Sequence, residues 1–217
     1  MMLAKIMSPP KPASPRLEAI NRWLAALAGR AEVQVEKALL ALSQRNPKLA
    51  FEVTAGANQI ADLNRAIEAD ATTLLSGILE PAQVRSCVAA VKAAGLLMRI
   101  SEQAVEIARD LQSAPALPPG PVSVLVRLGS LSRQTLGEAI DAFVRNEPDK
   151  AIAAARHNGE ADALYASLVK DLLGYVAADP SHAESGMRLL FIARSLERIS
   201  GHAHEIAESV VAAEPVA

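Results

Sequence analysis

Three polar residues near the carboxyl end of the chain have types that could bind a metal ion. Glu197, His204 and Glu208 are spaced so that they share one face of a helix, with Gly201 between them. Carboxylate oxygens and imidazole nitrogens are common ligands of iron, zinc and manganese. The alternative is a solvated face on which His204 and Glu208 form an ion pair worth about 0.3 kcal/mol, and we favour it. His202 points to another side of the helix and does not form a metal pair with His204.

These residues belong to a predicted helix over 186–211 that has a continuous apolar stripe. Its apolar residues recur at spacings of three and four, which is the period of one buried helix face. A second stripe lies 99 residues upstream. The two stripes are Leu189, Ile192, Leu196, Ile199, Ala203, Ile206 and Val210, and Ala90, Ala93, Leu97, Ile100, Ala104, Ile107 and Leu111. The chain is therefore predicted to be an internal duplication in which each half forms one supersecondary unit.

Prolines divide the rest of the chain in the same way in both halves. Pro47 and Pro148 are 101 residues apart, and Pro81 and Pro180 are 99 residues apart. The residue before a proline avoids the helical conformation, whereas proline itself is tolerated in the first turn of a helix. The predicted helices cover 16–46, 47–78, 81–111, 122–146 and 149–177, and the last begins at 180.

This pattern predicts an all-α fold of two tandem three-helix repeats packed as a six-helix bundle. The expected divisions are a disordered, proline-rich lead-in over 1–15, a first repeat over 16–111, a proline-rich linker over 112–121, a second repeat over 122–213 and a tail over 214–217.

Composition excludes several classes of function. The formal net charge is −2 and no basic stripe occurs, so we expect no nucleic-acid partner. No apolar run reaches the roughly 18 residues of a membrane span, so we expect no membrane insertion. Cys87 is the only cysteine, which suits a small core residue in a cytoplasmic protein. The sequence has no glycine-rich nucleotide loop and no Ser-His-Asp or Glu-x-x-His arrangement, so we expect no enzyme.

Four further residues have both a structural and a chemical interpretation. Arg99 and Arg198 recur at equivalent places and could pair with a carboxylate or bind a phosphate group; we favour the ion pair. Trp23 and Tyr165 are predicted to be packing residues.

The segment Leu196-Glu197-Arg198-Ile199, near the end of a second three-helix repeat, resembles the PhoU family of accessory regulators of bacterial phosphate transport. The resemblance begins at about Arg16 and includes Leu128-Gly129, Asp141-Ala142-Phe143, and Asp162 with Tyr165. It implies a cytoplasmic regulator that contacts a phosphate transporter and a sensor histidine kinase, and so damps phosphate uptake and the starvation response.

The resemblance also implies metal clusters, but the ligand positions have changed. The family's third helix typically reads Glu-Arg-Ile-Gly-Asp, and carboxylates of the second helix complete each cluster. The acids that remain at ligand positions are Glu197 and Asp162 in the second repeat and Glu102 in the first, with Glu106 nearby. The other ligand positions hold Ala57, Ala61, Met98, Asn158 and Gly201. Hard metal sites need several converging oxygen ligands, so we expect no cofactor and at most weak binding of iron, zinc or manganese.

Two alternatives to the regulator remain open. One is a metal-binding helical-bundle protein that uses Glu197, Asp162 and the histidines at 202 and 204. The other is a structural dimerisation module. A homodimer is expected for the regulator as well.

Overall fold

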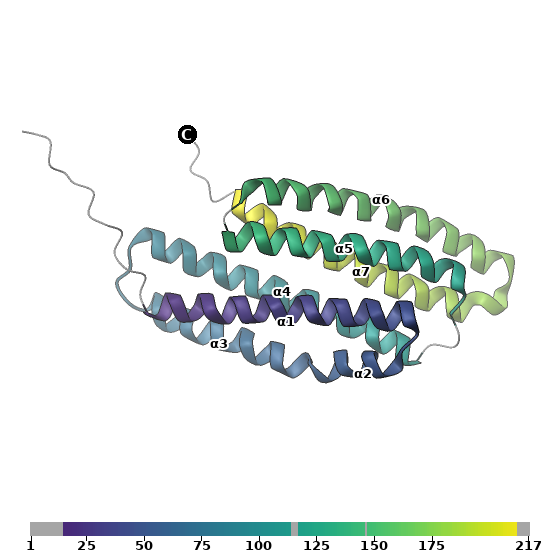
Figure 1. Cartoon of the computed structure of the whole chain (residues 1–217), viewed down its shortest axis with the longest axis horizontal. Coiled ribbons are helices and arrows are strands. Elements are labelled where there is room, and N and C mark those ends of the chain that lie inside the picture. The colour runs from purple at the N-terminus through teal and green to yellow at the C-terminus, as the bar shows by residue number, and fades with distance from the viewer. Residues whose placement is uncertain (1–14, 114–116, 146, 212–217) are drawn as a thin grey trace, which may run out of the picture.

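The computed structural model describes residues 15–113, 117–145 and 147–211. Most of these residues are helical, and there is no strand among them (Figure 1). Most of the predicted lead-in, part of the predicted linker and the tail over 214–217 lie outside the described residues. The elements are α1 (Pro15–Gln44), α2 (Pro47–Ala55), α3 (Ala57–Leu75), α4 (Pro81–Ser113), α5 (Pro119–Arg145), α6 (Pro148–Ala178), the 3-10 helix η1 (Pro180–His182) and α7 (Ala183–Val211). The predicted all-α class is confirmed.

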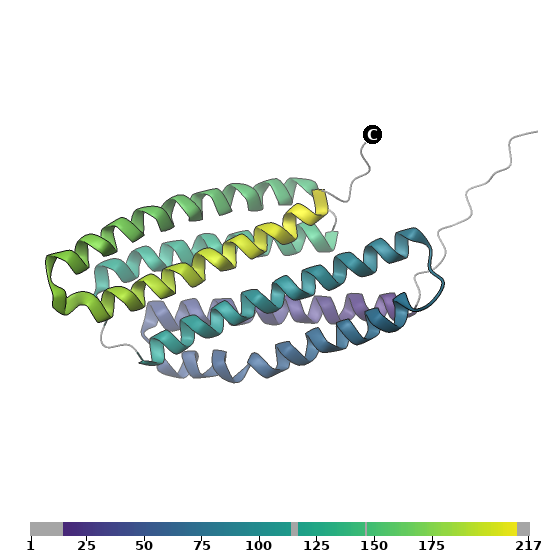
Figure 2. The same cartoon turned by 180° about the vertical axis from the view of Figure 1, so that it is seen from behind.

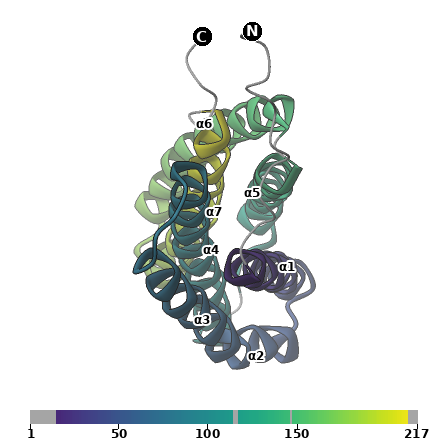
Figure 3. The same ribbon diagram turned by 90° about the vertical axis from the view of Figure 1, so that its left-hand side faces the viewer.

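The helices form two bundles that lie side by side along their length. Helices α1 to α4 pack on one another, as do α5, α6 and α7, and contacts of α4 with α7 and of α1 with α5 join the two bundles. Helices α6, α7, α4 and α3 follow one another across one face of the molecule (Figure 2). In the end view, α1 and α5 lie on one side of this layer, to its right (Figure 3).

Proline and its neighbours start several of the helices, as the sequence predicts. Pro47, Pro81 and Pro148 are the first residues of α2, α4 and α6. The Asn46 side chain accepts hydrogen bonds from the amides of Lys48 (3.0 Å) and Leu49 (3.4 Å), so it caps α2. Each proline occupies a position where its missing amide hydrogen costs nothing.

The prediction of one continuous helix over 47–78 is wrong, because the helix breaks at Gly56. The break faces Gln34 of α1, whose Nε2 donates to the carbonyl oxygen of Val53 over 2.8 Å. A side chain that inserts into the backbone ladder is a known cause of helix interruption. Gly56 itself has an ordinary right-handed φ of −76°, so glycine's conformational freedom does not cause the break.

Two other boundaries also differ from the prediction. The predicted linker over 112–121 is shorter, since α4 continues to Ser113 and α5 begins at Pro119. Pro119 and Pro121 therefore lie in the first turn of α5, which tolerates proline. At the start of the last helix, Pro180 opens the short η1 before α7 begins.

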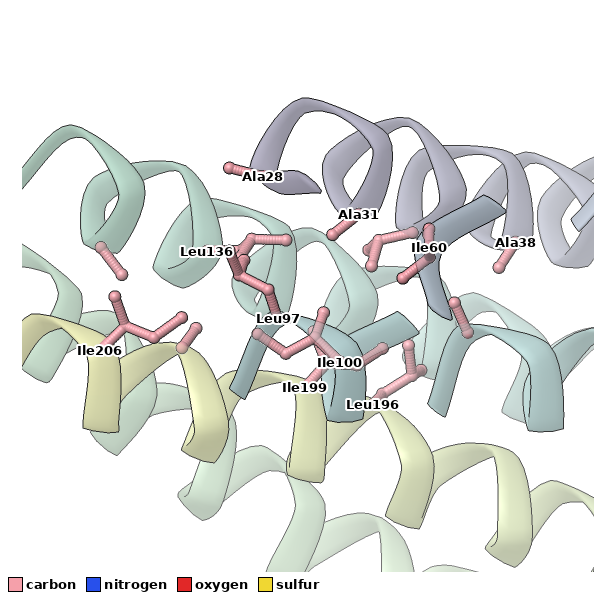
Figure 4. Close-up of a cluster of buried hydrophobic side chains, with 14 of the residues drawn as sticks. Ala28, Ala31, Ala38, Ile60, Leu97, Ile100, Leu136, Leu196, Ile199 and Ile206 are labelled. Carbon is pink, nitrogen blue, oxygen red and sulfur yellow. The ribbon is translucent and has the colours of Figure 1, made fainter. Parts of the chain in front are cut away.

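The two apolar stripes meet in the centre of the molecule. Leu97 and Ile100 of α4 lie close to Ile199 of α7 and Leu136 of α5 (Figure 4). Ile100 and Ile199 are fully buried, as are nearly all stripe residues, and only Leu111 is half-buried. One hydrophobic core therefore spans both repeats.

The structure also decides the packing of the other residues. Cys87 is fully buried, as predicted. Tyr165 packs half-buried against the core, but Trp23 is 42% exposed, so the prediction of a packing role is wrong for Trp23. None of the described helices has the length and apolar character needed to cross a membrane.

Candidate functional site

The polar residues of α7 singled out from the sequence do not share one site. Glu197 and His204 are half-buried, Glu208 is exposed, and His204 Nε2 lies 3.3 Å from Glu208 Oε1. His202 contacts a different carboxylate, with Nδ1 3.2 Å from Glu205 Oε1. The two histidines thus contact different carboxylates of the same helix.

Asp162 of α6 and Glu197 of α7 are close enough for their charges to interact. Burial raises the pKa of Glu197 above its ordinary value of 4.5, and the negative charge of Asp162 raises it further. The positive charges of Arg194 and Arg198 act in the opposite direction. Asn158 Nδ2 donates to Asp162 Oδ2 over 3.3 Å. The structure therefore brings the two predicted acids of the second repeat close together where α6 packs on α7.

The residues around Asp162 and Glu197 do not fit the metal cluster that the family resemblance implies. Two of its ligand positions hold Asn158 and Gly201, which leaves the carboxylates of Asp162 and Glu197. Across the described ranges, no three side chains of His, Cys, Asp or Glu gather where they could hold one metal ion. Two carboxylates and an amide are too few hard ligands for a cluster of several oxygens.

The ligand positions of the first repeat line a hollow of about 430 Å³ between α3 and α4. Ala57, Ala61 and Met98 form part of its wall, and Glu102 lies at its rim. Glu102 has no hydrogen-bond or ion-pair partner among the described residues, whereas Glu106 pairs with Arg109 at 2.6 Å. Glu102 thus lies between α3 and α4, away from the α6/α7 contact of Asp162 and Glu197, and the three predicted ligands do not converge.

A second hollow, which the sequence analysis missed, lies between α4 and α7 and has a volume of about 760 Å³. Lys92 and Arg99 line its α4 side, and Glu205 and Glu208 line its α7 side. Lys92 and Arg99 are seven residues apart, which corresponds to about two helical turns. This spacing is the one signal in the sequence from which a shared helix face for the two cations could have been predicted.

The predicted ion pairs of Arg99 and Arg198 are not formed. Among the described residues, neither guanidinium group has a carboxylate within ion-pair distance. Arg99 instead faces the α4/α7 hollow, and Arg198 acts on Glu197 only through its charge.

Equivalent positions of the two repeats also carry buried polar pairs. Ser101 Oγ donates to Gln34 Oε1 in the first repeat, and the hydroxyls of Thr135 and Ser200 lie 3.1 Å apart in the second. Gln34 and Thr135 differ by 101 in number, and Ser101 and Ser200 by 99. These pairs follow the offsets of the predicted duplication and fix the register of α1 on α4 and of α5 on α7.

Comparison with known proteins finds the same duplication. The model of the PhoU domain matches residues 24–111 and again residues 125–210. A phosphate-specific transport system accessory protein PhoU homolog from Zymomonas mobilis is 31% identical over 198 residues, covering 89% of this chain and 83% of the relative. A homolog of the same name from Pseudomonas aeruginosa is 32% identical over 200 residues, covering 90% and 82%.

Solved structures agree with the fold. The crystal structure of PhoU from Pseudomonas aeruginosa superposes with a TM-score of 0.87 at 29% identity, covering 90% of this chain and 95% of that one. The PhoU structure from Streptococcus pneumoniae, at 24% identity and a TM-score of 0.82, shares the fold. These matches confirm the two tandem repeats. Since both halves match the PhoU domain and the relatives align over most of their length, the chain belongs to the PhoU family.

Proposed function

We propose that this protein is an accessory regulator of phosphate-specific transport and acts by protein contact. The observation that carries the proposal is the match of both repeats to the PhoU domain, together with relatives named as accessory proteins of that transport system. The role needs a folded surface that a partner can recognise. The layer of α6, α7, α4 and α3 supplies one, with a hollow between α3 and α4 and another between α4 and α7 (Figure 2).

Regulation without catalysis is part of the proposal. The largest of the hollows described above is lined by charged residues and also by His202 and Ser209. No hydrogen bond joins these two side chains, because His202 Nδ1 contacts Glu205 and Ser209 Oγ donates to the carbonyl oxygen of Ile206. Catalysis of acyl or phosphoryl transfer needs a nucleophile or base held against such a group, or a bound metal ion. The surface is better suited to binding than to chemistry.

The partners that fit this role are a phosphate transporter and a sensor histidine kinase, contacted from the cytoplasmic side. A homodimer is also part of the proposal. Light scattering on the purified full chain at several concentrations measures the oligomeric state, and a monomer at all concentrations would remove the dimer from the proposal.

The function is tested by deleting the gene and measuring phosphate uptake and a starvation-response reporter at high external phosphate. The deletion strain is expected to keep the reporter active despite abundant phosphate, and the wild-type gene is expected to restore repression. Unchanged uptake and unchanged reporter activity in the deletion strain would contradict the proposal.

Metal binding is the second candidate, and the interaction of Asp162 with Glu197 is the observation in its favour. Elemental analysis of the purified protein beside the double variant Asp162→Ala, Glu197→Ala tests it. We expect less than one iron, zinc or manganese ion per chain and no difference between the two proteins. A stoichiometric ion that the double variant loses would instead show a metal site built from a reduced ligand set.

A further inference from the structure

The seam between α4 and α7 has two ends that the duplication makes equivalent, and only one of them is closed. At the closed end, Arg188 Nη1 donates to Ser113 Oγ over 2.7 Å and lies 3.8 Å from Asp110 Oδ1. At the other end, the positions 99 residues away from Arg188 and Asp110 hold Ala89 and Ser209. The long side chain and its carboxylate partner are both missing at these two positions, and Ser209 is one of the residues that line the hollow of about 760 Å³.

The two walls of this hollow, which we call the α4/α7 groove, carry opposite charges that do not neutralise each other. Lys92 and Arg99 on the α4 wall are exposed and have no carboxylate within ion-pair distance among the described residues. On the α7 wall, Glu205 contacts His202, and Glu208 contacts a histidine of its own helix. The groove is therefore wide enough to keep its cations and carboxylates apart.

The space between the walls is lined by small and apolar side chains. Ala93, Gly95 and Leu96 of α4 lie between the two cations and contribute to the lining. A Cβ atom added at Gly95 would meet no atom within 4 Å, so this part of the lining is open. A side chain of a partner can therefore enter the groove at Gly95 without displacing the core.

The charge arrangement selects the kind of ligand that fits. A small anion near Lys92 and Arg99 would also face two carboxylates, and a small cation near the carboxylates would face the two cations. A helix with acidic side chains on one flank and basic side chains on the other can pair with the cations of α4 and with the carboxylates of α7. Its apolar edge would then cover the apolar lining of the groove. Such a helix also packs as a ridge into a groove, which is the normal geometry of helix contacts.

We propose that the α4/α7 groove is the docking site for an amphipathic helix of the phosphate transporter, with carboxylates facing α4 and lysine or arginine facing α7. This inference rests on the proposed function, because that function supplies the partner. The α4/α7 groove also lies where the two repeats differ in sequence, since Ser209 in its lining corresponds to Asp110 at the closed end.

The first test measures binding of the full-length protein to the phosphate transporter of the same organism, held in nanodiscs, by biolayer interferometry. The double variant Lys92→Glu, Arg99→Glu is expected to bind at least about tenfold more weakly, because like charges then face the acidic flank. Arg127→Glu, Lys170→Glu is the matched control, since both residues are exposed, lie on α5 and α6 and undergo the same charge change. The control is expected to keep wild-type affinity.

A second pair of variants blocks space without changing charge. Gly95→Trp fills the groove and is expected to abolish binding, whereas Gly159→Trp adds the same side chain at an exposed glycine of α6 that also has open space around it. Helicity and melting temperature of all variants are compared with the wild type, so that loss of binding can be separated from loss of folding.

The possible results distinguish failure of the docking-site proposal from failure of the proposed function. Binding of the groove variants with wild-type affinity would overturn the docking site while leaving the proposed function intact. A wild-type protein that does not bind the transporter would overturn both. Groove variants that change the mass of the protein in solution, with transporter binding unchanged, would assign the groove to a second copy of this chain and overturn the transporter as its occupant.

Discussion

Ser101 and Ser200 occupy equivalent places in α4 and α7. Replacing each serine by alanine has a different consequence for its hydrogen-bond partner. Without the Ser101 hydroxyl, the buried Gln34 Oε1 has no donor, whereas Thr135 keeps its bond to the Leu131 carbonyl at 3.0 Å. An unpaired buried polar atom costs about 1–3 kcal/mol. We therefore expect Ser101→Ala to lower the free energy of unfolding by about 2 kcal/mol and Ser200→Ala by less than half as much. Urea unfolding of both variants measures the difference, and equal losses would contradict the explanation.

Glu197 is expected to make the free energy of unfolding depend on pH. Its pKa lies above the ordinary 4.5 because of burial first and Asp162 second, so folding favours the protonated carboxyl. The stability that this group contributes is fully present below pH 4.5 and is lost as the pH rises through the raised pKa. At pH 7, Glu197→Gln is therefore expected to increase the free energy of unfolding, by about 0.5 kcal/mol because water screens a partly exposed group.

The measurement is a set of denaturant curves between pH 4 and pH 8 for the wild type, Glu197→Gln and the control Glu160→Gln on the exposed side of α6. The wild type and the control should lose stability over the same pH window, and Glu197→Gln should lose less. A destabilised Glu197→Gln at pH 7 would show that the carboxylate is instead held by a favourable partner.

At the scale of one element, the start of α2 is fixed by a side-chain cap that α6 lacks. Asn46 accepts two amide hydrogen bonds, whereas Glu147, its equivalent before α6, makes no side-chain cap bond. Loss of an N-cap costs about 1 kcal/mol. Asn46→Ala is expected to lower the free energy of unfolding by that amount and Glu147→Ala by clearly less, as measured by thermal and urea unfolding. The explanation fails if the two substitutions are equally costly.

The break between α2 and α3 shows how a neighbour can override the pattern of an element. An alanine Cβ at Gly56 would lie 3.5 Å from the Glu52 carbonyl oxygen and 3.8 Å from Gln34 Nε2, which are ordinary contacts. Gly56→Ala is therefore tolerated, and the higher helix propensity of alanine limits any change in stability to about 1 kcal/mol. The bond from Gln34 to Val53 is what separates the two helices.

At the scale of the whole molecule, the shared core makes the two repeats one folding unit. Ile100 and Ile199 are fully buried and lie together where α4 meets α7 (Figure 4). Truncation of a buried isoleucine to alanine costs about 2–5 kcal/mol. Ile100→Ala and Ile199→Ala are each expected to lower the stability of both repeats, and Ile152→Ala, at a position 67% exposed, is the control that changes little.

Hydrogen exchange measured separately on α1 to α4 and on α5 to α7 checks this prediction. Fluorescence of Trp23, the only tryptophan, follows the first repeat and should give the same unfolding midpoint as far-UV circular dichroism. Separate transitions for the two repeats would show that the core between them does not couple their folding.

Patterns within single helices were sufficient to determine the class of the molecule. The spacing of residues such as Leu196 and Ile199 identified the buried face, and the prolines at 47 and 148 identified where helices start. These features depend on the period of the helix and on the missing amide hydrogen of proline, which are local properties. The offset between the two halves then made the duplication visible, and Glu197 and Asp162 followed from the family resemblance.

Contacts between helices decided the rest. The bond from Gln34 to Val53 joins side chain and backbone of different helices, so periodicity could not reveal the break at Gly56. The divergence of Ser209 from its equivalent Asp110 has a consequence only where α4 lies against α7, because Ser209 lines the α4/α7 groove whereas Asp110 pairs with Arg188. Sequence alone therefore determined which face of each helix is buried. The tertiary structure determined which polar groups meet across those faces, because such meetings depend on distances between segments far apart along the chain.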